Sequence, residues 1–81
     1  MPAHSPLPSD QSTAQLQALG EQIRARRKSL RVSSTAAAEA AGMSRVTLHR
    51  IEKGEPSVAG GAWANAMAAL GLTLLARNTE D

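Results

Sequence analysis

The segment from Ser33 to Gly54 constrains the fold more than any other part of this 81-residue chain. Its first half is rich in alanine, starts at Ser33 or Ser34 and ends at Gly42, and Ser44 then opens a second run that stops at Gly54. Alanine favours helix, serine caps helix N-termini, and glycine commonly ends helices. The segment therefore predicts two short helices joined by a tight turn.

A longer helix is predicted before this segment. We expect it to begin after Ser12, a suitable N-cap, and to run to about Leu30. Gly20 lies inside it and indicates either close packing or a break, so the region forms one helix or two. Apolar residues recur through the region at helical spacing, at Leu16, Leu19, Ile23 and Leu30.

A last helix is predicted from about Val58 to Leu70, after Glu55-Pro56-Ser57 and before Gly71. Its apolar stripe includes Trp63, the only aromatic residue of the chain, which we interpret as a core anchor. A core made otherwise of Leu, Ile, Val, Met and Ala suits closely packed helices, and the chain is long enough for one small domain. The sequence thus predicts an all-α bundle of four to five helices.

The two ends of the chain differ from this helical part. Residues 1–12 are rich in Pro and Ser and are expected to form a disordered arm, which leaves 13–71 as the folded domain. Residues 72–76 follow a helix-ending glycine and predict one short strand, with Leu72 and Leu74 on the same face, before a polar tail at 77–81.

A lone strand in a helical chain lacks a hydrogen-bonding partner. The simplest partner is the same strand in a second copy, which would form an intermolecular two-stranded antiparallel sheet in a homodimer. The alternatives are an extended tail and an extra helical turn packed on the core. The residues expected in the dimer contact are Leu72, Leu74 and Leu75.

Positive charge is concentrated in the middle of the chain. Eight basic and three acidic residues lie between Glu21 and Lys53, whereas the rest has one basic and four acidic residues. An anionic partner requires such a distribution, although solvated helix faces would also produce it.

Composition disfavours several classes of function. The chain has no cysteine and two histidines, and no motif for a metal site, a catalytic set or a cofactor-binding loop, so we expect neither an enzyme nor a cofactor. No apolar run reaches the roughly 20 residues of a membrane span, and no signal sequence is recognised, so a cytoplasmic protein without a membrane partner is expected. Single-stranded RNA binding is disfavoured because base stacking needs aromatic side chains.

The helix from Ser44 to Lys53 is amphipathic. At about 100° per residue, Leu48 and Ile51 point to one side and should pack on the alanines of the preceding helix, Ala37, Ala38 and Ala41. The opposite side collects Arg45, Val46, His49, Arg50 and Lys53. Two helices in this arrangement are typical of a helix-turn-helix, in which the second helix enters a DNA groove.

From about Leu19 to Leu74 the chain resembles the phage-repressor (Cro/C1, or Xre) helix-turn-helix family. The resemblance implies a lambda-repressor-like bundle that binds double-stranded DNA. The family usually has Gln where this chain has Ser34, and commonly Leu where Ala37 stands. The matching residues are Leu19-Gly20, Ile23-Arg24, Arg27, Ala38, Ala41-Gly42-Met43-Ser44, Leu48, Ile51-Glu52, Gly54, Pro56-Ser57 and Ala69-Leu70-Gly71-Leu72.

The resemblance also implies roles for single residues. Arg45 and Val46 would read bases, because Arg binds guanine bidentately and Val contacts a thymine methyl, and Arg50 would reach a base or a phosphate. His49 would face the groove, with or without a contact. Contacts to the DNA backbone are implied for Ser34, Ser44, Thr47 and Lys53. Arg27 and Glu52 match a structural ion pair of the family.

Two functions follow from this resemblance. The first is a transcriptional repressor that binds a palindromic operator as a homodimer. The second is an antitoxin, because the Leu-Gly-Leu ending and the terminal strand are similar to HipB-type antitoxins, which also bind a partner toxin.

Overall fold

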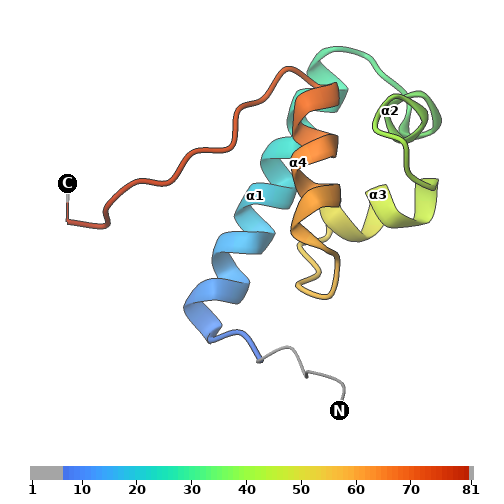
Figure 1. The fold of residues 1–81 in the computed structure, drawn as a ribbon. Helices are drawn as coiled ribbons and strands as arrows, with labels where there is room; N and C mark the ends of the chain where they lie inside the picture. The colour runs from blue at the N-terminus through green and yellow to red at the C-terminus, as the bar shows by residue number, and fades with distance from the viewer. Residues whose placement is uncertain (1–6, 81) are drawn as a thin grey trace.

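The computed structural model describes residues 7–80, and the regular secondary structure in that range is entirely helical (Figure 1). The helices are α1 (Asp10–Ser29), α2 (Ser34–Ala40), α3 (Arg45–Glu52) and α4 (Gly60–Ala69). The prediction of an all-α fold is therefore confirmed, with four helices in residues 7–80. None of these helices is long and apolar enough to cross a membrane.

Helix α1 begins earlier than predicted. Ser9, not Ser12, is the N-cap, because the Ser9 side chain accepts a hydrogen bond from the Ser12 backbone N–H at 3.1 Å. Asp10 adds a negative charge to the first turn, where the helix dipole favours it. The predicted disordered arm at 1–12 is therefore wrong for residues 10–12, which are helical, while residues 1–6 lie outside the described part.

Close packing is the reason for the glycine in the middle of α1. The helix runs through Gly20 without a break, and a Cβ at this buried position would collide with the backbone carbonyl oxygens of Ile51 and Glu52. The missing side chain thus lets α1 approach the backbone of α3. Leu30 does not join the apolar stripe as predicted; it is the C-cap of α1 and is 45% exposed.

Each helix ends in the same hydrogen-bonding pattern, with a residue of positive φ just after the C-cap. Gly42, Gly54 and Gly71 hold this position after α2, α3 and α4, as the sequence predicted. After α1 the position is held by Arg31, with a φ of 57°. The left-handed conformation disfavours a side chain by about 1–2 kcal/mol, so the α1–α2 turn is strained at Arg31.

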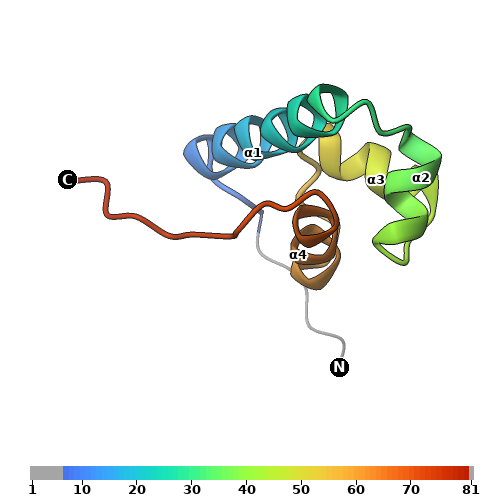
Figure 2. The ribbon, with the colours of Figure 1, turned by 90° about the horizontal axis from the view of Figure 1, so that it is seen from above.

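The core lies where the four helices meet. Ile23 of α1 and Leu48 and Ile51 of α3 are at most 1% exposed, and the predicted core anchor, Trp63 of α4, is 6% exposed. As predicted, Ala37 and Ala38 of α2 and its C-cap Ala41 are buried, on the side of α2 that faces α3. Small side chains on α2 therefore allow α2 and α3 to lie close together, as seen in Figure 2.

Helix α4 begins two residues later than predicted, at Gly60 rather than Val58. Val58 is half-buried against the core in a turn, in which its N–H donates to the Glu55 carbonyl at 3.4 Å. Ala59 is the N-cap and offers no side-chain hydrogen bond. Helix α4 therefore starts without a side-chain cap, directly after a turn in which Val58 packs on the core.

Residues 72–78 form a tail without regular secondary structure, which leads away from α2 and α3 (Figures 1 and 2). Leu72 is half-buried and packs on the core, whereas Leu74 and Leu75 are 59% and 84% exposed. The alternative of an extra helical turn is therefore wrong for this segment. A sheet between two copies cannot form within one chain, so it stays a prediction.

Candidate nucleic-acid interface

An ion pair holds α3 in place on α1. Arg27 Nε donates to Glu52 Oε2 at 2.8 Å, and Nη2 donates to Oε1 at 3.0 Å. Arg27 Nη1 also donates to the Val32 carbonyl at 3.0 Å, so one guanidinium joins α1, α3 and the α1–α2 turn. The hydrogen bond to Glu52 raises the pKa of Arg27 despite the opposing effect of burial. Arg27 is therefore a fixed cation, and its geometry sets the position of α3.

Ser44 caps α3 as the sequence predicted. Its Oγ accepts a hydrogen bond from the Thr47 N–H at 3.1 Å and lies 3.0 Å from Thr47 Oγ1, where one hydroxyl donates to the other. The two hydroxyls carry two protons and use one between them. The other proton is left to donate to an acceptor outside the protein, such as a phosphate oxygen.

Burial of the apolar side of α3 fixes which residues face outward. With Leu48 and Ile51 in the core, Arg45, Val46, His49 and Arg50 are exposed on the other side. Val46 is 64% exposed directly beside Arg45. The first turn of α3 thus presents a cation and an apolar side chain together.

An open hollow of about 530 Å³, which we call the arginine hollow, lies between α1, α2 and α3. Ser34 lines it, and its hydroxyl is not needed to cap α2, because Ser33 accepts from the Ala36 N–H at 3.0 Å. Three arginines against one glutamate make the hollow positive. It is lined by Arg24, Arg27, Ser34, Arg45, Val46, His49 and Glu52. The structure therefore brings four of the predicted DNA contacts, Ser34, Arg45, Val46 and His49, to one place.

Arg24 is a candidate that the sequence analysis missed. It is exposed and lines both the arginine hollow and a neighbouring one of about 300 Å³, which also includes Lys53 and His49. Its position three residues before Arg27 places both on the same side of α1. This spacing is the sequence signal that could have identified Arg24. Arg27 pairs with Glu52 of α3, so a residue on the same side of α1 also lies near α3.

Arg50 lies apart from the other exposed residues of α3. It lines neither hollow, and its Nε is 3.6 Å from Glu55 Oε2, with both side chains about half exposed. An exposed ion pair of this kind contributes about 0–1 kcal/mol, so Arg50 can leave Glu55 for a base or a phosphate. The exposed residues of α3 were predicted to form a single face. In the structure most of them line the two hollows, whereas Arg50 lies apart from them.

The chain matches a known protein family over most of its length. Residues 18–79 match the sequence model of a family described as a helix-turn-helix domain. No curated protein shows significant sequence similarity to the chain. Within residues 7–80, no group of three or more His, Asp or Glu side chains is arranged to hold a metal ion. The matched range contains both hollows and Arg50.

Proposed function

Because the chain belongs to the helix-turn-helix domain family, we propose that it is a transcriptional repressor that binds a palindromic operator as a homodimer. In this kind of domain the second helix of the motif enters the major groove, and here that helix is α3. Within the wider family, the resemblance to the Cro/C1, or Xre, type of regulator supports the same role.

The exposed first turn of α3 is the observation that carries the proposal. Arg45 and Val46 lie side by side at the helix start, exposed and next to the positive arginine hollow. An arginine there can bind O6 and N7 of guanine, and a valine can contact a thymine methyl. An apolar side chain that is 64% exposed on a cationic face fits base contact better than it fits contact with water.

Side chains around α3 supply the contacts that position the protein on DNA. Ser34, the Ser44–Thr47 hydroxyl pair and Lys53 were predicted to contact phosphates, and Arg24 lies with Ser34 in the arginine hollow and with Lys53 in the neighbouring one. Phosphate contacts carry little sequence information but dominate the salt dependence. Affinity for any duplex should therefore fall steeply as salt rises.

A homodimer supplies the second recognition helix. Two copies of α3 would enter successive major grooves about 34 Å apart, so the operator should be a near palindrome. The dimer contact is proposed for Leu72, Leu74 and Leu75, of which the last two are largely exposed in one chain.

An antitoxin role is the alternative proposal, and it adds a toxin partner to the same DNA binding. The exposed Leu74 and Leu75 are also available to such a partner. Co-purification with the product of the neighbouring gene separates the alternatives, because a repressor without a toxin leaves that product unbound.

A matched pair of variants tests the DNA-reading site. Arg45→Ala should weaken operator binding about 10- to 100-fold and relax the base preference at one position. Lys28→Ala removes an exposed charge of α1 that lines neither hollow, and should change affinity less than about threefold. Fluorescence anisotropy with a labelled operator measures both. Equal effects of the two changes would show that α3 does not read bases.

A further inference from the structure

The first residues of the C-terminal tail leave α4 in a fixed direction. Gly71 has a φ of 72°, and the Leu72 N–H donates to the Met67 carbonyl at 2.8 Å. Arg26 of α1 donates from Nε to the Leu70 carbonyl at 3.0 Å. Leu72 then packs on the core. The start of the tail is thus positioned by both α1 and α4.

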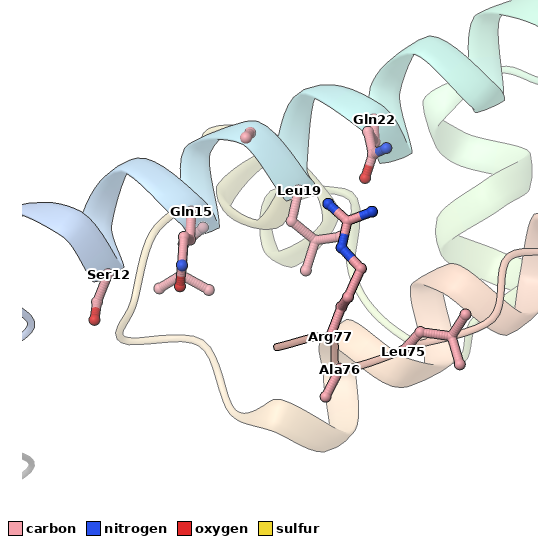
Figure 3. Close-up of a pocket in the computed structure, with 9 residues that line it drawn as sticks. Ser12, Gln15, Leu19, Gln22, Leu75, Ala76 and Arg77 are labelled. Carbon is pink, nitrogen blue, oxygen red and sulfur yellow. The ribbon is translucent and has the colours of Figure 1, made fainter. Parts of the chain in front are cut away.

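Beyond Leu72 the tail forms one wall of a second kind of hollow, which we call the tail groove. It has a volume of about 890 Å³ and lies between the tail and the N-terminal two thirds of α1 (Figure 3). Its α1 side includes Leu16 and Leu19, which are half-buried on the core, and the exposed Ala18. Arg77 extends from the tail toward Leu19 in Figure 3. The groove is lined by Ser12, Gln15, Leu16, Ala18, Leu19, Gln22, Leu75, Ala76 and Arg77.

The tail wall of this groove carries an open backbone edge. The backbone groups of residues 73–78 have no hydrogen-bond partner among residues 7–80. An extended segment with unpaired N–H and C=O groups is a template for pairing with another extended segment. Leu74 and Leu75, at 59% and 84% exposed, lie on this same segment.

The occupant of the tail groove must supply an extended backbone edge and apolar side chains without charge. Residues 73–76 have the sequence Thr-Leu-Leu-Ala, which is uncharged, and the groove lining contains no carboxylate. Four extended residues span about 13 Å, which matches the roughly 15 Å from Ser12 to Gln22 along α1. The tail of a second copy therefore has the length, the edge and the chemistry that the groove requires.

We propose that residues 73–76 of a second copy occupy the tail groove, pair antiparallel with the tail of the first copy, and contact Leu16 and Leu19. Because the arrangement has two-fold symmetry, each copy gives and receives one tail. This inference rests on the proposed homodimer and adds the surface on α1 that receives the partner. Since α1 also carries Arg24 and the Arg27 ion pair, a partner seated on α1 sets the spacing of the two α3 helices.

Cysteine cross-linking tests the inference directly, because the chain has no cysteine of its own. Ala18→Cys chains are mixed with Leu75→Cys chains and oxidised, and the linked peptides are identified by mass spectrometry. A disulfide between positions 18 and 75 can then form only between two copies. We expect a product of twice the 8.5 kDa chain mass that contains this linkage. Ala40→Cys mixed with Leu75→Cys is the control, since Ala40 is exposed but does not line the groove.

A charge placed in the groove gives a second readout. Ala18→Arg should raise the dimer dissociation constant about 30-fold or more, measured by sedimentation, while Ala40→Arg changes it little. Both positions are exposed, so the helical circular dichroism of the chain should be unchanged. If the wild-type chain is a dimer but shows no excess of the 18–75 linkage and no effect of Ala18→Arg, the tail groove is not the seat and the homodimer stands. If the wild-type chain is a monomer at micromolar concentration, the homodimer and this inference both fail.

Discussion

Replacing Arg27 with alanine removes the cation that joins three parts of the fold. Two hydrogen bonds to Glu52 and one to the Val32 carbonyl are lost together. The Glu52 side chain is only 7% exposed, so its carboxylate is left with little water and no cation. The variant should therefore be destabilised far more than a surface substitution.

The expected magnitude follows from this geometry. Breaking a buried ion pair by removing one partner destabilises a protein by about 3–5 kcal/mol. We take the lower end, about 3 kcal/mol, because Arg27 is 11% exposed and water can reach the vacated space. For a domain of this size that loss lowers the melting temperature by about 12–24 °C. The total stability of such a domain is of order 4–12 kcal/mol, so the variant would be marginally folded.

Thermal unfolding followed by circular dichroism measures the loss, with Lys28→Ala as the control for removing a charge from α1. Glu52→Gln and the double variant complete a double-mutant cycle that isolates the pair. Because the pKa of Arg27 is raised in the folded state, its charged form stabilises the fold fully at every pH below the ordinary arginine pKa. This stabilisation is lost only as the pH rises through the raised pKa. The Arg27 contribution should therefore be constant from mildly acidic to mildly basic pH. An unchanged midpoint, or a coupling energy below about 0.5 kcal/mol, would show that the Arg27–Glu52 pair does not stabilise the fold.

Three further predictions concern the packing of α1 on α3, the α1–α2 turn and the charge beside Arg50. Gly20→Ala should lower the free energy of unfolding by about 3 kcal/mol, because the new Cβ meets backbone carbonyls of α3. Gly61→Ala, in open space in α4, should raise the free energy of unfolding by about 1 kcal/mol. Urea denaturation in which both changes had the same sign would contradict this packing. Arg31→Gly should raise stability by about 1 kcal/mol by relieving the positive φ, and a loss in the same assay would show that the turn is not strained. Glu55→Gln should free Arg50 and raise affinity for unrelated duplex DNA about threefold at low salt; an effect that persists at high salt would rule out this charge effect.

The helix-turn-helix segment could be predicted because its signals are local. Gly42 and Gly54 adopt the positive φ that ends a helix, and Ser44 accepts the hydrogen bond that begins one. Each of these roles depends on one residue and its near neighbours. The burial of Leu48 and Ile51 followed from helical periodicity in the same way.

Features that depend on tertiary contacts could not be predicted as well. Ser9 and Ser12 are equally good caps by type, and the choice between them depends on where the chain starts to pack. No local signal marks Arg31 as a residue of positive φ, because glycine usually holds that position. The helical wheel of α3 put Arg50 with Arg45, but α1 and α2 border only part of that face, which leaves Arg50 beside Glu55.

Selection of binding sites from a random pool of double-stranded DNA directly tests whether α3 reads bases. Base reading by the two α3 helices of a homodimer predicts enrichment of a near-palindromic site whose half-sites are about one helical turn apart, with binding that weakens steeply as salt rises. It also predicts that Arg45→Ala chains select a site with a relaxed preference at one position of each half-site. A pool in which no sequence is enriched, or a site that Arg45→Ala leaves unchanged, would contradict base reading by α3.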